Sequence, residues 1–331
     1  MLRFKIILAI LVLSLSVSAC AKSEAKTGEY VWQEITAKAE FPQSYNYPVY
    51  LMNDGNLLAL NQGGWLSKDG KDWTKTSLPE SGLNSAYQKF VQFKGAIYAL
   101  GALQGNYSDF KISTKISRTT DGKFWETVAE TSNLPHRIFY GATVFNDKIW
   151  LIGGFDGKKY YNDVWSSAHG VNWTRVAEKA SFSERNVSKI AVFKNKIWII
   201  GGSVIDGDKV LNPNADKEIW SSNDGINWTQ TKNNSTDKLS GTPVVFDGKL
   251  WLIGGNRNDG NFANALYVSE DGENWKEQSA PWSPRGGVVA WVFQDKLFMT
   301  GGKYSFTKNG EITFVYSNDI WAMSKSQNTE R

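Results

Sequence analysis

The hydrophobic pattern of the chain is dominated by one segment that recurs four times with little change. Each copy has an apolar run, two polar residues, a second apolar run and a glycine pair, and the copies read VFNDKIWLIGG (144–154), VFKNKIWIIGG (192–202), VFDGKLWLIGG (245–255) and VFQDKLFMTGG (292–302). Short apolar runs joined by two polar residues are typical of two antiparallel strands and a tight turn. Weaker copies lie at 92–102 and 51–64, so the sequence predicts six units.

A second motif, of the form SxDGxxW, occurs near the end of each of the first five units. Its copies lie at 67–73, 119–125, 167–173, 222–228 and 269–275. Asp-Gly between strands is a strong hairpin signal, because Gly accepts the positive φ of the tight turn. We interpret the motif as structural, with Ser and Asp bonding backbone N–H groups and Trp packing the outer edge of the unit. A glycan contact is the alternative; His169, which replaces the Asp in the third copy, is interpreted as a solvent-facing substituent.

The sixth unit lacks this second motif, and its missing strand is found at the other end of the chain. Trp32 and the three residues after it resemble Trp173 and its successors, so we expect the N-terminal segment to supply the outermost strand of the last sheet. The second strand of each unit is apolar at consecutive positions, which is typical of a strand covered on both faces. The sequence therefore predicts an all-β, six-bladed β-propeller of four-stranded antiparallel blades over 29–325, with a tail at 326–331.

The glycine pair that closes the second strand, followed by an aromatic residue in the third, resembles the kelch repeat. The aromatic residues are Trp165, Trp220, Tyr267 and Trp321. The resemblance covers nearly the whole chain after residue 28 and implies a propeller like the central domain of galactose oxidase. The SxDGxxW turns are similar to the Asp-box turns of sialidase-like propellers, but one residue shorter. The second unit departs from the kelch pattern at Gly101-Ala102 and Ser117, and the first has no loop between Gly64 and Trp65.

The first twenty residues have the pattern of a secretory signal, with basic Arg3 and Lys5, an apolar run over 6–17 and small residues before Cys20. The sequence VSAC at 17–20 resembles the bacterial lipobox, which implies cleavage before Cys20 and acylation of its thiol. We expect a signal peptide over 1–19, the lipidated Cys20 with a polar tether over 20–28, and a membrane-anchored protein of the bacterial cell envelope, outside the cytoplasm. An outer-membrane location is expected if the cell has two membranes. An ordinary signal peptide with an incidental Cys is the alternative.

Composition narrows the possible chemistry. The chain has 331 residues, of which 41% are hydrophobic, one is Cys and two are His, and its net charge is +4. A disulfide scaffold and a metal site of three His are therefore excluded, and the weak charge argues against nucleic-acid binding. Copper-radical oxidases of similar fold need a Tyr–Cys thioether, which the use of Cys20 as the anchor excludes. We expect no cofactor, no metal and a monomer.

The alternation of strand direction assigns the motifs to two faces of the disc. The SxDGxxW turns fall on one face, here called the turn face, and the variable connections between second and third strands fall on the other, here called the loop face. Four cations recur eight residues before the Phe that ends the first strand, namely Arg137, Arg185, Lys238 and Arg285. Rotation about the axis predicts a ring of them near the channel mouth. Further candidates for ligand binding on the loop face are His136, Arg257, Tyr160 and Tyr304.

Two interpretations of the cation ring remain open. The arginines either bond neighbouring backbone carbonyls or a loop carboxylate such as Glu184, or they form an anion site for an acidic sugar, a carboxylate or an acidic peptide.

No catalytic set is recognisable, so we expect a non-catalytic module that binds a protein or another ligand through the loop face. The alternative is a carbohydrate-active enzyme of the sialic-acid isomerase or glycoside hydrolase type, with an Arg-lined site at the channel mouth. An acid and a Tyr or His converging beside Arg137, Arg185 and Arg285 would favour the enzyme. A purely structural envelope protein would instead have its mouth plugged by its own side chains.

Overall fold

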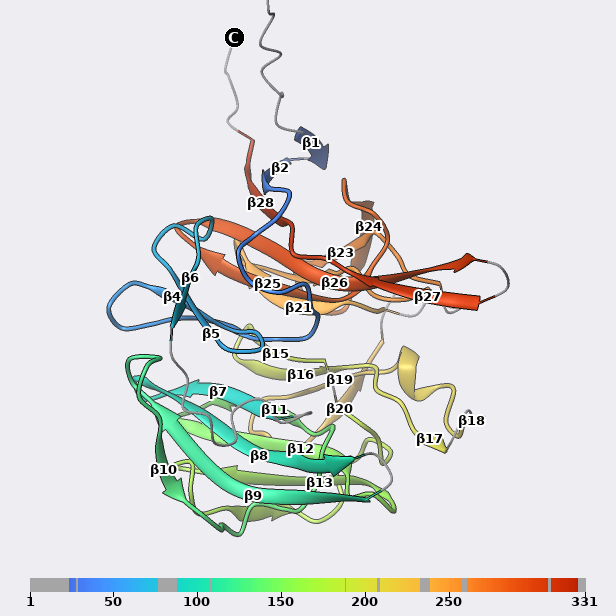
Figure 1. The fold of residues 1–331 in the computed structure, drawn as a ribbon. Helices are drawn as coiled ribbons and strands as arrows, with labels where there is room; N and C mark the ends of the chain where they lie inside the picture. The colour runs from blue at the N-terminus through green and yellow to red at the C-terminus, as the bar shows by residue number, and fades with distance from the viewer. Residues whose placement is uncertain are drawn as a thin grey trace, which may run out of the picture.

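The computed structural model describes residues 24–27, 29–76, 88–106, 109–187, 189–206, 209–232, 239–257, 261–308 and 311–326. Six antiparallel sheets of four or more strands follow one another along the chain and are arranged around an axis (Figure 1). The predicted all-β, six-bladed propeller is therefore confirmed. Within these ranges, no helix has the length and hydrophobicity needed to cross a membrane.

The blades are numbered in chain order, and each runs from its innermost to its outermost strand. Blade 1 comprises β3 (Val49–Leu51), β4 (Leu57–Leu60), β5 (Gly64–Ser67) and β6 (Thr74–Thr76). Blade 2 comprises β7 (Lys89–Phe93), β8 (Ala96–Asn106), β9 (Asp109–Thr119) and β10 (Glu126–Ala129). Blade 3 comprises β11 (Gly141–Phe145), β12 (Lys148–Phe155), β13 (Tyr160–Ser167) and β14 (Thr174–Ala177).

The remaining blades repeat the same order. Blade 4 comprises β15 (Ile190–Phe193), β16 (Lys196–Ile200), β19 (Ile219–Ser222) and β20 (Thr229–Thr231). Blade 5 comprises β21 (Thr242–Phe246), β22 (Lys249–Ile253), β23 (Ala265–Ser269) and β24 (Trp275–Ser279). Blade 6 comprises β25 (Gly286–Phe293), β26 (Lys296–Lys308), β28 (Ile320–Lys325) and β2 (Tyr30–Thr36).

The ring closes in blade 6 as the sequence predicts. Strand β2 pairs antiparallel with β28, with Trp32 opposite Met323, so the N-terminal strand completes the last sheet. Trp32 is fully buried and meets the ring of Trp282 edge-on, with 4.6 Å between the ring centroids. Strand β1 (Glu24–Thr27) then pairs with β2 and widens this sheet. We expected only a polar tether there, because the short polar segment has no strand pattern.

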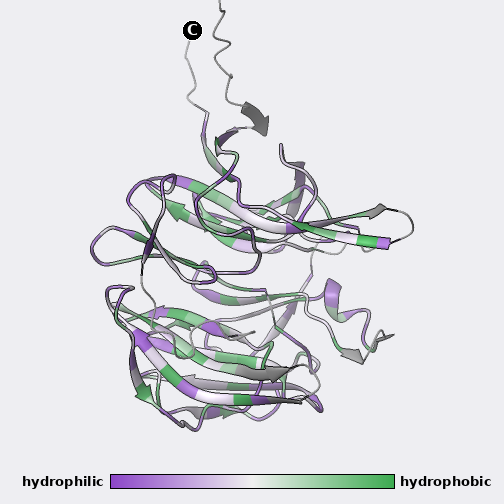
Figure 2. Ribbon diagram, viewed as in Figure 1, coloured by the Kyte–Doolittle hydropathy of each residue, from purple (hydrophilic) through white to green (hydrophobic). Residues whose placement is uncertain are grey.

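The second strands form the centre of each blade and are covered on both faces. In β12, every residue from Ile149 to Gly154 is buried, which confirms the interpretation of the consecutive apolar residues. Figure 2 shows hydrophobic residues gathered in the strands and hydrophilic ones in many of the turns. The core therefore lies between neighbouring blades, as expected for sheets that pack face to face.

The SxDGxxW turns have the predicted structural role. In blade 4, Ser222 Oγ accepts the N–H of Gly225 at 2.8 Å, and Asp224 Oδ1 accepts two further N–H groups of the turn. Gly225 has φ +75°, and a Cβ there would lie 2.3 Å from the Trp150 ring of the preceding blade. Glycine is required both for the dihedral angle and for the approach of this turn to the sheet of the preceding blade.

The N-terminal segment also occupies the place of the missing sixth turn. The ring of Tyr30 meets that of Trp251, the blade-5 counterpart of Trp150, edge-on at 5.0 Å. Its hydroxyl donates to Asp247 at 2.8 Å. One aromatic side chain thus substitutes for a whole turn in covering the face of blade 5.

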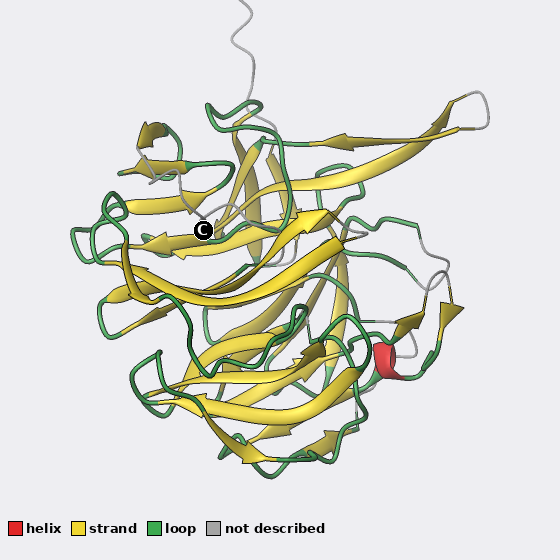
Figure 3. Cartoon of the chain, turned by 60° about the horizontal axis from the view of Figure 1, so that its bottom comes forward, coloured by secondary structure: helices red, strands yellow, loops and turns green. Residues whose placement is uncertain are grey.

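The loop face is uneven, because its connections are long in blades 2, 4 and 6. Blades 2 and 6 extend their strands into the hairpins β8–β9 and β26–β27, the latter closed by β27 (Glu311–Tyr316). Blade 4 inserts β17 (Ile205–Asp206), β18 (Lys209–Val210) and a short 3-10 helix, Ala215–Lys217. The β26–β27 hairpin stands clear of the disc in two views (Figures 1 and 3).

Candidate functional site

The first arginine of the predicted ring is buried inside blade 3. Arg137 donates to the carbonyl of Gly153 at 3.1 Å and to both carboxylate oxygens of Asp163, at 2.5 and 3.2 Å. The indole N–H of Trp165 donates to the same carboxylate at 2.8 Å. This Arg–acid–Trp triad ties the segment before the first strand of the blade to the second and third strands.

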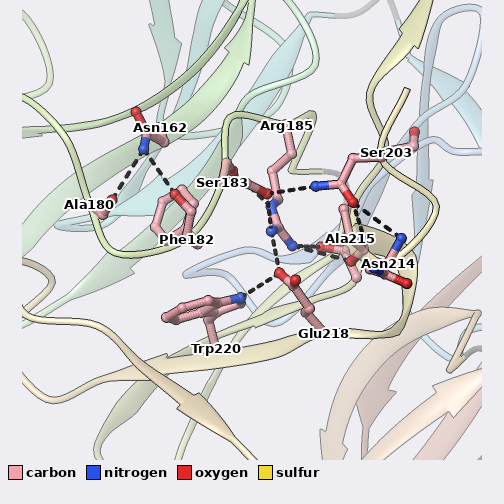
Figure 4. A network of polar contacts seen from close by, with 12 residues as sticks. Asn162, Ala180, Phe182, Ser183, Arg185, Ser203, Asn214, Ala215, Glu218 and Trp220 are labelled. Carbon is pink, nitrogen blue, oxygen red and sulfur yellow. Dashed lines mark hydrogen bonds and ion pairs between the residues drawn. The ribbon is translucent and has the colours of Figure 1, made fainter. Parts of the chain in front are cut away.

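The same triad recurs in blade 4, as Figure 4 shows. Arg185 is fully buried and pairs with Glu218, which also accepts the Trp220 indole N–H at 2.9 Å. Arg185 further donates to the carbonyl of Gly201 at 3.3 Å and to Ser183 Oγ at 2.6 Å. Burial acts to raise the pKa of Glu218, but the bonds from Trp220 and Arg185 outweigh it and lower that pKa.

Blade 6 carries the third triad. Arg285 Nη1 donates to Asp319 at 2.6 Å and to the carbonyl of Gly301 at 3.3 Å, and Trp321 donates to Asp319 at 2.9 Å. The three arginines thus point into the blades and are engaged by the chain's own groups. This geometry favours the structural interpretation, and the carboxylates come from acids in or just before the third strand instead of from Glu184.

The acidic partners were missed at the sequence level, although a signal for them exists. In the three blades with an Arg at the ring position, an acid stands two residues before the strand-three Trp. The other blades have neither an Arg at the ring position nor this acid, and the residues at the acid position are Gly63, Lys115 and Ala265. A comparison of the six units would have shown that the Arg and the acid are either both present or both absent, and this pairing indicates the triads.

Two of the candidate residues belong to segments that the structure does not describe. Cys20, expected to carry the lipid, and Lys238, expected in the cation ring, both lie outside the described residues. The expectations for them remain those of the sequence.

A polar cluster lies above the blade-3 triad on the loop face. The ring of Tyr161 covers the Arg137 guanidinium at 3.9 Å, and its hydroxyl donates to Asp156 at 2.6 Å. Burial and then the bond to Asp156 raise the pKa of Tyr161 to about 12. Although burial acts to raise the pKa of Asp156, its bonds with Tyr161 and two backbone N–H groups lower it. An acid and a Tyr therefore converge beside Arg137, and the Tyr is held as a neutral phenol.

The remaining candidates are spread over three blades. His136 is exposed next to the blade-3 triad, and Tyr160 is half-buried with its ring centroid 4.7 Å from that of Phe155. Arg257 of blade 5 is exposed and lies 3.7 Å from Glu277. Tyr304 is half-buried in the β26–β27 hairpin of blade 6.

The β26–β27 hairpin carries the most prominent apolar surface on the loop face. Phe306 is 45% exposed, Ile312 67% and Phe314 50%. At its base, the Lys303 ammonium lies 4.9 Å from the ring centroid of Tyr45 and 5.2 Å from that of Phe314. Sequence analysis did not single out this set, because the exposure of apolar residues in a strand cannot be read from the sequence pattern.

Comparisons with known proteins agree with the architecture. Residues 136–166, from the ring position to the strand-three Trp of blade 3, match the Kelch motif. The Kelch repeat protein M-T8 of Myxoma virus (strain Lausanne) is 30% identical over 98 residues, which are 29% of this chain and only 18% of the viral protein. The solved structure of YjhT superposes with a TM-score of 0.64 at 13% identity, over 85% of this chain and 99% of that one, and shows a common fold. The chain is therefore a six-bladed β-propeller that carries a kelch motif.

Proposed function

We propose that the protein is a non-catalytic binding module that holds a partner protein on its loop face, chiefly through the β26–β27 hairpin. The observation that carries this proposal is the exposure of Phe306, Ile312 and Phe314 on one projecting hairpin. Apolar side chains that are exposed together on one projecting element mark an interaction site, whereas singly scattered apolar residues do not.

The buried triads support a protein ligand over a small acidic one. Arg137, Arg185 and Arg285 already pair with carboxylates of their own blades. An acidic sugar would have to displace a buried ion pair, which leaves a buried charge without a partner. The hairpin needs no such exchange.

The proposed setting is the bacterial envelope. A signal peptide over 1–19 and a lipid on Cys20, both inferred from the sequence, would tether the disc by the outer edge of blade 6, where β1 and β2 lie. The loop face and its hairpin would then be displayed beside the membrane for a partner to reach.

A matched pair of variants tests the proposal. Phe306, Ile312 and Phe314 are replaced together by Ser in the full chain, and Phe124, 79% exposed in a turn-face motif, is replaced by Ser as the control. Both proteins are expressed in the native host, crosslinked in living cells, and the captured proteins are quantified. We expect the hairpin variant to lose its principal partner and the control to keep it. Retention by both would show that the hairpin is not the binding surface.

One observation favours the second candidate, a carbohydrate-active enzyme: the Tyr161–Asp156 pair beside Arg137. The raised pKa of Tyr161 and the lowered pKa of Asp156 leave the pair without a group poised to exchange protons near neutrality. Binding therefore remains the function that the geometry supports best. Conversion of acidic sugars, followed by NMR, that disappears in Tyr161→Phe would reverse this preference.

A further inference from the structure

The backbone of the β26–β27 hairpin has one free edge. Strand β27 pairs with β26 and with no other described strand. At the base of the hairpin, the N–H of Ser317 donates to the carbonyl of Gly302 at 3.1 Å, so the backbone groups of Ser317 face β26. Along an antiparallel strand, residues whose backbone groups face the partner strand alternate with residues whose groups face away from it. The N–H and C=O groups of Ile312 and Phe314 therefore point away from β26.

This edge lacks the features that usually protect an edge strand. Strand β27 contains no proline and one charged residue, Glu311, at the turn. Natural edge strands are commonly blunted by lysines, prolines, bulges or a covering loop. An unprotected edge of this length can accept a further strand.

The side chains suit such a strand on both faces of the hairpin. The register places Phe306 on one face and Ile312 with Phe314 on the other, because directly paired residues share a face. A flat docked surface would need apolar residues on one face alone. An added strand alternates its own side chains between the two faces and would cover both.

A charge at the hairpin base specifies one further property of the partner. Lys303 pairs with Tyr316 and lies on the same face as Phe314, where Tyr45 stacks on Tyr316 at 5.5 Å. Its ammonium lies over two aromatic rings, and no described carboxylate is within ion-pair distance of it. A carboxylate on the incoming segment would complete the pairing.

We infer that the free edge of β27 takes up an extended segment of a partner protein as an added strand, with apolar residues on both of its faces and one carboxylate that pairs with Lys303. The inference rests on the proposed function and specifies how the hairpin holds its ligand. A protein segment is favoured over a lipid bilayer because the exposed Glu311 stands at the start of β27, near the tip of the hairpin. Insertion of the hairpin tip into hydrocarbon would have to bury this charge.

The test begins with peptides selected by phage display against the full chain. The strongest binder is made with a single N-methyl group at each backbone position in turn, and binding is followed by fluorescence anisotropy. Strand addition predicts a loss of about tenfold or more at every second position, where a backbone donor faces β27. The protein is unaltered in this scan, so its folding does not affect the result.

Protein variants then separate backbone from side chain. Phe314→Pro removes an outward N–H that β26 does not use, and Phe314→Ala removes the side chain only, so the first should bind at least tenfold more weakly than the second. Lys303→Met should weaken binding roughly tenfold and abolish the preference for an acid in the selected peptides. Lys158 is an exposed lysine elsewhere on the loop face, so Lys158→Met is the control and should leave peptide binding unchanged.

The outcomes distinguish the inference from the proposed function. Loss of binding in the triple Ser variant, with no alternation in the N-methyl scan, would preserve the function and overturn strand addition. Peptide binding that is unaffected by substitutions in the hairpin would overturn both. The same holds if no peptide binds and the hairpin instead mediates binding to phosphatidylglycerol vesicles.

Discussion

The third SxDGxxW turn lacks the carboxylate that the other four possess, so restoring it should stabilise the protein. In blade 4, Asp224 Oδ1 accepts the N–H groups of Ile226 and Asn227, each at 2.8 Å. In blade 3, His169 stands at the Asp position, and Ser167 Oγ alone bonds the turn, at 2.8 Å to the N–H of Gly170. His169→Asp supplies the missing acceptor.

The expected gain follows from two new hydrogen bonds. A net contribution of about 0.5–1.5 kcal/mol per bond applies, and the partly exposed turn places each bond near the lower end. The sum is about 1 kcal/mol, which for a chain of this size corresponds to a rise in Tm of roughly 2 °C.

The gain should depend on pH in a defined direction. Burial acts to raise the pKa of Asp224, but its bonds to the turn outweigh that effect and lower the pKa from 3.8 to about 2. A carboxyl whose pKa falls on folding stabilises the protein above its unfolded pKa and ceases to do so as pH falls through the folded one. The advantage of Asp at position 169 should therefore be complete at neutral pH and vanish near pH 2.

Calorimetric melting of three variants checks this reasoning. His169→Asp and His169→Asn both supply an acceptor, but only the first titrates, and His169→Ala supplies none. The expected order of Tm at neutral pH is Asp above Asn above Ala. An Asp variant no more stable than the Ala variant would refute the hydrogen-bond account, and a gain that persists near pH 2 would refute the role of the charge.

Two further predictions concern the interior, and both are measured by denaturant unfolding. Asp319→Ala should cost about 3–5 kcal/mol because it leaves Arg285 buried without its carboxylate, and the added change Arg285→Met should recover most of that loss. If the double variant regained none of the lost stability, the cost would come from packing and not from the unpaired charge. Gly225→Ala should cost about 1–3 kcal/mol more than Gly248→Ala. Both glycines have positive φ, but only the first would place its Cβ against Trp150, so equal losses would contradict the packing argument.

The architecture could be predicted because its determinants are local and repeated. Each unit contains its own turns, and six imperfect copies average out the ambiguity of any single one. The closure by β2 was predictable for the same reason, since the similarity of Trp32 to Trp173 reveals the borrowed strand. Strand β1 was not, because a polar segment at a sheet edge is held by backbone pairing, which leaves no hydrophobic pattern.

The environment of the cations was less predictable than the architecture. Their partners Asp163, Glu218 and Asp319 lie 26, 33 and 34 residues further along the chain, beyond any local pattern. Rotational symmetry correctly indicates equivalent positions, but it says nothing about the direction of a side chain. A long Arg that starts near the axis can reach outward into its own blade, as these do.

The buried arginine of blade 6 connects the structural and the functional parts of the molecule. Arg285 bonds Gly301 in β26 and Asp319 just before β28, and these two points bracket the chain that forms the β26–β27 hairpin. A hairpin fixed at both ends of its base keeps its exposed edge in one orientation, which reduces the conformational entropy lost when a partner binds. A cation that no ligand touches can thus contribute to affinity through the rigidity of the surface above it.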